Sequence, residues 1–182
     1  MRRLRSLTSG LNLALLATGC LLTPAVMQAQ QADGERVLQL LSDAKAEALQ
    51  LRNDSDELSA ISRSSKAWQT YSAKINMIKE HVNTTGKLLT DMREAEAVAD
   101  PWQKGAMNQI EPLLQELAAN TDRTIKYLNE NQNRVHMPEM KDLTKANLAL
   151  ARDPETLIGD YVDYGNAKQT YERLAGKLKV AD

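Results

Sequence analysis

The sequence of 182 residues contains one cysteine, no phenylalanine, five prolines and eight glycines. A single cysteine excludes a disulfide within the chain and any cysteine-rich zinc or iron–sulfur site. The 23 basic residues nearly balance the 24 acidic ones, which excludes the basic stripe typical of a nucleic-acid-binding protein. Sparse glycine, proline and aromatic residues, with 42% hydrophobic residues, favour a protein of long helices over one of sheets.

The chain also lacks the short motifs that mark many enzymes. It has no glycine-rich phosphate loop, no Gly-x-Ser-x-Gly turn and no His-Glu-x-x-His pair. Neither His81 nor His136 follows a glutamate by three residues, which excludes the di-iron centre of helical bundles. We therefore expect a protein that is not an enzyme, with no catalytic residues, no metal and no cofactor.

Haem needs a separate test, because exported four-helix bundles often carry it. The sequence has no Cys-x-x-Cys-His attachment motif. Residues 138–142 resemble a helix start of the small periplasmic b-type cytochromes, which bind haem through a methionine near the first helix start and a histidine on the last helix. The corresponding segments here, 33–61 and 138–179, contain no methionine and no histidine, respectively. Both axial ligands are therefore missing.

Residues 1–29 have the features of a secretory signal peptide. Three arginines within the first five residues precede an apolar stretch at 11–22 and a small-residue exit at Ala29. The apolar stretch is shorter than the roughly 20 residues of a membrane span. We expect cleavage after Ala29, which leaves a single domain of residues 30–182. Removal of three arginines and no acid changes the net charge from −1 to −4.

Residues 17–20 leave a second interpretation open. The sequence Ala17-Thr18-Gly19-Cys20 resembles the bacterial lipoprotein signal, in which the cysteine becomes the lipidated N-terminus. However, Ala17 stands where that signal usually has leucine, and two leucines follow Cys20 where a polar tether is expected. We favour a periplasmic or secreted protein, with a lipid-anchored form through Cys20 as the alternative.

From residue 33 on, the apolar residues recur with a helical period, and no stretch alternates long enough to predict a strand. We predict four helices, at 33–61, 65–98, 101–134 and 138–179. The last two begin with proline, which suits the first helical position because its missing amide would be unpaired there. Two polar clusters, 53–56 and 62–65, compete as the turn between the first two helices.

Apolar residues seven apart form seams along these helices, as in helices that pack side by side at shallow angles. The first helix has Val37, Leu41, Ala44, Ala48, Leu51 and Leu58. Residues 61–98 combine Ile61, Trp68, Ile75, Val82 and Leu89 with Tyr71, Ile78, Thr85 and Met92. The third is interrupted by Thr121 and Thr124, and the last has Leu143, Leu150, Leu157, Tyr164, Tyr171 and Leu178.

Short connections force neighbouring helices to run antiparallel. The predicted fold is therefore all-α: an elongated antiparallel up-down four-helix bundle with coiled-coil-like packing, preceded by a signal peptide. Pro154 falls inside the last helix, where it either kinks the helix or begins a new one. We favour a kink, because the seven-residue spacing continues across it. Gly159 and Gly165 have two interpretations: they allow another helix to approach the last helix closely, or they are tolerated within it without a packing role.

Three tyrosines of the last helix, Tyr161, Tyr164 and Tyr171, form the one candidate ligand site. Polar-tipped aromatic residues of this kind can line a cleft between helices. The favoured interpretation is that they fill the core in place of phenylalanine, with their hydroxyls reaching solvent. His81 similarly has two interpretations, a pH-sensing or metal-binding group or an isolated surface side chain, of which we favour the second.

Several segments together resemble a group of exported helical bacterial proteins of unknown function. They are residues 68–71, 74–76, 78–83, 86–89, 101–103, 112–114 and 161–165. The resemblance implies export and an all-helical fold, and it implies no activity. We expect a non-enzymatic helical bundle of the bacterial envelope that binds a protein partner or a second copy through its helix faces, without a membrane span after signal removal. The alternative is a small-ligand sensor or carrier.

Overall fold

The computed structural model describes residues 24–64 and 67–179, and their side chains from residue 34 on. This part of the chain forms four long helices and no strand, which confirms the all-α prediction. None of these helices is both long and apolar enough to span a membrane, within the described ranges. The helices are α1 (Pro24–Ile61), α2 (Trp68–Glu94), α3 (Pro101–Glu130) and α4 (Pro138–Leu178), with a short 3₁₀ helix η1 (Gln132–Arg134).

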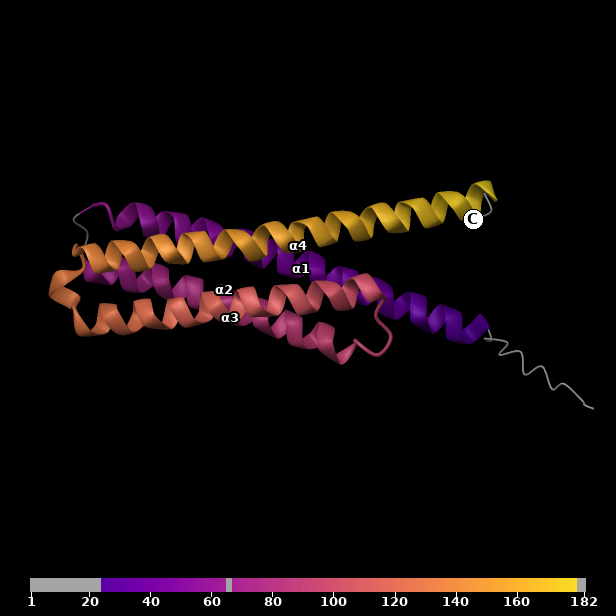
Figure 1. The fold of residues 1–182 in the computed structure, drawn as a ribbon, viewed down its shortest axis with the longest axis horizontal. Helices are drawn as coiled ribbons and strands as arrows, with labels where there is room; N and C mark the ends of the chain where they lie inside the picture. Colours follow the sequence, from indigo (N-terminus) through magenta and orange to yellow (C-terminus); the bar gives the residue numbers. More distant parts are fainter. Residues whose placement is uncertain (1–23, 65–66, 180–182) are drawn as a thin grey trace, which may run out of the picture.

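Each long helix packs on two others, α1 on α2 and α4, and α3 on the same pair. Consecutive helices run in opposite directions, so the four form an elongated array (Figure 1). The α1–α2 turn begins at residue 62, whereas the competing cluster at 53–56 lies inside α1, where Asp54 and Ser55 are buried. Of the predicted signal peptide, residues 1–23, Cys20 among them, lie outside the described residues.

The predicted seams of the first two helices lie in the observed core, except that Ile61 ends α1 and is only partly buried. All six seam residues of α1 are buried, from Val37 to Leu58. On α2, every seam residue from Tyr71 to Met92 is buried, and Trp68 is partly buried. Large apolar side chains occupy these positions, so the period of burial can be read from the sequence.

The predicted seam of the last helix is wrong by one position. The buried residues of α4 are Met140, Thr144, Asn147, Ala151, Pro154, Ile158, Val162 and Gly165. The predicted residues Leu143, Leu150 and Leu157 lie beside this seam and are half-buried. Tyr164, Tyr171 and Leu178 are 53%, 59% and 67% exposed. Most of the buried α4 side chains are small or polar. The more hydrophobic residues lie one position away along the helix, so a prediction based on hydrophobicity chose that neighbouring row.

Hydrogen bonds between α3 and α4 explain why polar residues occupy this core. The Thr121 hydroxyl donates to Asn147 Oδ1 over 3.0 Å, and Asn147 Nδ2 donates to the Thr124 hydroxyl over 2.9 Å. Asn120 Nδ2 donates to the Leu143 carbonyl oxygen over 3.2 Å. Buried polar groups are stable when paired in this way, so the threonines that interrupt the third predicted seam fix α3 against α4.

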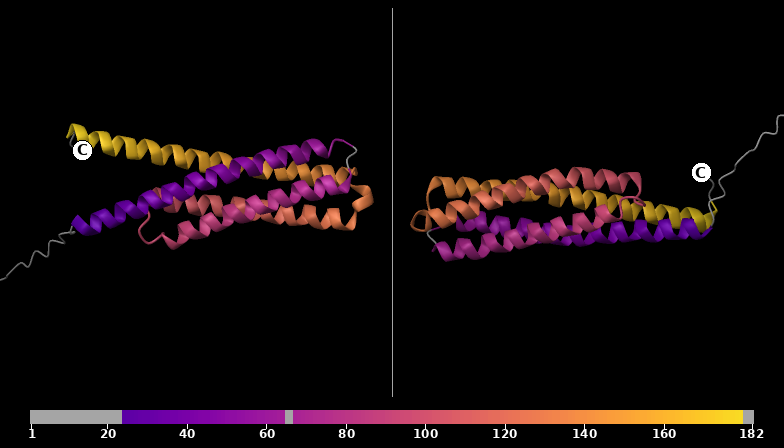
Figure 2. Two further views of the ribbon diagram at one scale, coloured as in Figure 1. Left: turned by 180° about the vertical axis from the view of Figure 1, so that it is seen from behind. Right: turned by 90° about the horizontal axis from the view of Figure 1, so that it is seen from below.

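Both internal prolines lie within continuous helices, Pro112 in α3 and Pro154 in α4. The last helix therefore continues through Pro154, as the favoured interpretation expects, and the alternative of a new helix that begins there is wrong. Past the α2–α3 connection, α1 and α4 continue beyond the other two helices and diverge from each other (Figure 2). The α4 overhang, residues 166–178, is about 20 Å long at the helical rise of ~1.5 Å per residue.

Candidate functional site

An open aromatic pocket lies between α3 and α4, where the overhang begins. It has a volume of about 290 Å³ and is lined by Trp102, Leu157, Asp160, Tyr161 and Tyr164. The ring centroids of Trp102 and Tyr161 are 6.4 Å apart in a stacked arrangement, and those of Trp102 and Tyr164 are 5.3 Å apart, edge to face. Both geometries are favourable for aromatic pairs, so the three rings support one another.

The start of α3 holds Trp102 in place. Its indole Nε1 donates to Asp100 Oδ2 over 3.1 Å, and the ammonium of Lys168 on α4 donates to the same oxygen over 3.0 Å. The Asp100 amide donates to Gln103 Oε1 over 2.9 Å, which satisfies one free amide at the helix start. Glu172 and Asp100, by accepting hydrogen bonds from Lys168, raise the pKa of that ammonium.

The far edge of the indole packs against α1 and α4. A Cβ added at Gly165 would lie 2.8 Å from Trp102 Cη2 and 2.6 Å from Leu38 Cδ1. Gly165 therefore allows α3 and α4 to approach closely, as one of the two interpretations of this glycine expects. Gly159, by contrast, faces only the end of Lys45 at an ordinary contact distance of 3.7 Å.

The pocket carries one carboxylate that has no ion-pair partner among the residues that the structure describes. Asp160 is exposed and makes no hydrogen bond or ion pair within the described part of the chain. Its neighbour Asp163 is different, because it pairs with Lys45 of α1 over 3.0 Å. Aromatic faces attract cations, so rings beside a free carboxylate suit a positively charged or amphipathic partner.

The structure brings together two of the three predicted tyrosines. Tyr161 and Tyr164 line the pocket, and the Tyr161 hydroxyl accepts a hydrogen bond from Gln109 Nε2 over 2.6 Å. Tyr171 lies farther along the overhang and does not line the pocket. Sequence reasoning missed Trp102 and Asp160 as pocket residues. Asp160 is detectable from its helical spacing to Tyr164, whereas Trp102 reaches the site only through the packing of α3 on α4.

His81 belongs to an ionic cluster between α1 and α2, so its interpretation as an isolated surface side chain is wrong. Its Nδ1 lies 2.7 Å from Glu47 Oε2, and its Nε2 lies 3.3 Å from Asp54 Oδ2. Lys74 completes the cluster, 3.0 Å from Asp54 Oδ1 and 2.7 Å from Glu57 Oε2.

This cluster links α1 to α2 through ion pairs. The carboxylates approach His81 at different ring nitrogens, and no group of three histidine, cysteine or acidic residues is arranged for a metal ion in the described part of the chain. Hydrogen bonds to Glu57 and Asp54 raise the pKa of Lys74, although burial acts in the opposite direction. His136 is exposed in the α3–α4 connection and makes no contact of this kind in the described chain.

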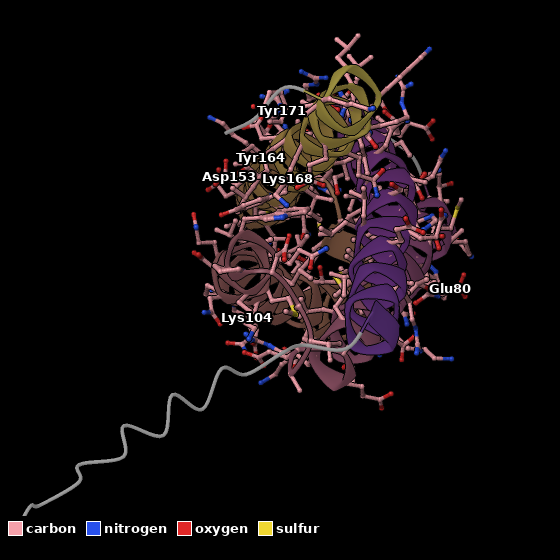
Figure 3. The ribbon with its side chains drawn as sticks, turned by 90° about the vertical axis from the view of Figure 1, so that its right-hand side faces the viewer. Glu80, Lys104, Asp153, Tyr164, Lys168 and Tyr171 are labelled. Carbon is pink, nitrogen blue, oxygen red and sulfur yellow. The ribbon has the colours of Figure 1, made fainter. Side chains whose placement is uncertain are left out.

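The pocket combines three aromatic rings with a single carboxylate. Figure 3 shows Tyr164, Lys168 and Tyr171 on one side of α4, whereas Glu80 lies on the opposite side of the molecule. Comparison with known proteins finds no family, no curated protein and no solved structure that matches the chain.

Proposed function

We propose that this chain is a non-enzymatic interaction module of the bacterial envelope, built as an antiparallel helical bundle, whose binding surface is the outer face of α4. One observation carries the proposal: four of the seven large hydrophobic side chains that are exposed in the described chain lie between Tyr164 and Leu178. Clustered exposed hydrophobic side chains mark protein-binding sites more often than scattered ones do. The absence of reactive motifs from the sequence supports a role without catalysis.

A photo-reactive amino acid placed at Leu174 tests this function in living cells. We expect a cross-linked protein product from position 174 and none from position 77. The control is matched, because Leu174 and Met77 are both 41% exposed but lie on different helices, α4 and α2. If position 174 yields no product, or yields no more than position 77, the interaction function is wrong.

The export step is supported by the arginine-led apolar segment at residues 1–29. Mass spectrometry of the N-terminus of protein recovered from its bacterial host tests it. A start at Gln30 is the expected result and identifies a periplasmic or secreted protein. A diacylated Cys20 identifies a lipid-anchored one, and an unprocessed Met1 contradicts export by this signal.

The aromatic pocket favours a second function, the binding of a small organic cation. Its three rings and the free carboxylate of Asp160 resemble the chemistry with which proteins hold alkylammonium groups. Choline and its neutral isostere 3,3-dimethyl-1-butanol test this function. Choline is expected to raise the melting temperature and the neutral alcohol is not, and Asp160→Asn is expected to remove the difference. Equal effects of both compounds contradict the proposal.

A further inference from the structure

We propose that the outer face of α4 pairs with the same face of a second copy of this chain, with the two helices antiparallel. This inference rests on the interaction function proposed above and identifies its partner. The face is a row of residues spaced alternately by three and four, the spacing of helices that pack side by side. The row is Leu157, Asp160, Tyr164, Ala167, Tyr171, Leu174 and Leu178.

This row is distinct from the seam that holds α4 in the bundle. The buried seam of α4 ends at Gly165, and its continuation along the helix falls on Gln169, Glu172 and Gly176. None of these residues has a large apolar side chain, and α1 and α4 diverge along this stretch (Figures 1 and 2). The apolar residues of the overhang lie on the other face, where Leu174 and Leu178 are 41% and 67% exposed.

Charge along α4 is divided into two opposite blocks. Residues 153–163 contain four acidic residues and no basic one, a net charge of −4, whereas residues 168–179 contain four basic residues and one acidic one, a net charge of +3. Asp153 and Asp160 lie along the row and Lys177 and Lys179 flank its far end, and these four are exposed and have no ion-pair partner in the described chain. Such a helix is complementary to a second copy of itself in the reversed direction.

An antiparallel crossing of the two α4 helices near Ala167 satisfies both the apolar row and the two charge blocks. It sets the basic block of each copy against the acidic block of the other, and it sets Leu174 and Leu178 beside the aromatic pocket of the second copy. The pocket volume of about 290 Å³ accommodates aliphatic side chains of this size. Because one twofold axis relates the two contacts, the interface closes on a dimer and does not propagate.

Charge also selects a second copy over an anionic membrane surface. A basic amphipathic helix alone suits anionic lipid, but here the acidic block continues the same face directly before the basic one. A flat anionic surface attracts one block and repels the other. A reversed copy is attracted by both.

Sedimentation equilibrium of the processed protein, from low micromolar to near-millimolar concentration, tests the pairing. We expect a reversible monomer–dimer equilibrium. The double variants Lys177→Glu/Lys179→Glu and Asp153→Lys/Asp160→Lys are each expected to raise the dimer dissociation constant at least tenfold. An equimolar mixture of the two variants is expected to restore a heterodimer, because their α4 blocks are then complementary.

The control is Lys79→Glu/Lys87→Glu, which makes the same charge change at two exposed, unpaired lysines of α2. It is expected to leave the dimer unchanged. Circular dichroism of every variant establishes that the helices are intact. A parent protein that stays monomeric overturns the inference, as does a dimer that survives both α4 reversals or a mixture that fails to associate.

These outcomes are distinguishable from failure of the interaction function itself. If the protein is monomeric but position 174 cross-links to a different protein in cells, the pairing is wrong and the interaction function stands. If the protein is monomeric and position 174 yields no product, both are wrong. Binding to vesicles of anionic lipid without self-association identifies a membrane surface as the occupant and also overturns the pairing.

Discussion

The indole of Trp102 on α3 lies so close to the backbone of Gly165 on α4 that no methyl group fits between them. A Cβ built at Gly165 would lie 2.8 Å from Trp102 Cη2, and Leu38 of α1 closes the other side at 2.6 Å. Three helices therefore meet at one glycine. This contact positions the wall of the aromatic pocket at the place where the bundle gives way to the overhang.

Gly165→Ala is expected to lower the free energy of unfolding by about 1–3 kcal/mol, because the added methyl group overpacks the contact with a rigid indole. Urea unfolding followed by circular dichroism measures the change. Gly86→Ala on α2 is the control, since a Cβ there meets nothing within 4 Å. Alanine favours helix over glycine by about 1 kcal/mol, so this variant is expected to gain stability. A gain in both variants would show that the contact at Gly165 is loose.

The same contact shows how far the sequence predicts this fold. Seven-residue spacing located the helices and the core faces of α1 and α2, because large apolar side chains occupy those positions. On α4 the core consists mostly of small and polar residues. Asn147 can be buried because its side chain is hydrogen-bonded to Thr121, 26 residues away in the sequence. Spacing along one helix cannot reveal a partner on another. Trp102 was missed at the pocket, and His81 at its cluster, for the same reason.

Asn147→Ala is expected to lower the free energy of unfolding by about 1–3 kcal/mol, because it leaves the buried hydroxyls of Thr121 and Thr124 without their α4 partner. The triple variant Thr121→Val/Thr124→Val/Asn147→Leu removes all the partners together. Its stability is expected to lie within about 1 kcal/mol of the parent, since an apolar core of similar shape carries no unpaired groups. Chemical denaturation checks both values. A triple variant as unstable as the sum of its single variants would contradict this account.

Lys74→Met is expected to lower the free energy of unfolding by about 2–3 kcal/mol, because it removes the ammonium from a carboxylate, Asp54, whose side chain is only 9% exposed. The Asp54 Oδ2 atom is buried and has no hydrogen-bond partner in the described chain, and His81 Nε2 lies 3.3 Å from it. Thermal melts at neutral pH measure the loss.

Adding Asp54→Asn to Lys74→Met is expected to recover more than half of that loss, because it removes the uncompensated charge. Lys79→Met, at an exposed position of the same helix, is expected to change stability by no more than about 0.5 kcal/mol. Equal losses in Lys74→Met and Lys79→Met would mean that the cluster contributes nothing to the α1–α2 contact.

Stability is expected to fall as the pH rises above about 10, where phenols and ammonium groups ordinarily ionise. Burial raises the pKa of Tyr71, and the hydrogen bond to Glu57 is the main cause that raises the pKa of Lys74. Both groups therefore hold their protons more tightly in the folded chain than in the unfolded one. Their contribution is complete below the unfolded pKa values and is lost as the pH rises through the raised ones.

Urea unfolding in steps from about pH 8 to about pH 11 measures this decline. Tyr71→Phe separates the two groups. It removes the hydrogen bond from the hydroxyl to the Ile61 carbonyl oxygen, 3.2 Å away, and so lowers stability at every pH. The variant also lacks one of the two ionisable groups. Its free energy of unfolding is therefore expected to decline less steeply with rising pH than that of the parent protein. Parallel curves for the two proteins would show that the phenol of Tyr71 titrates alike in the folded and unfolded chain, leaving Lys74 to account for the alkaline loss.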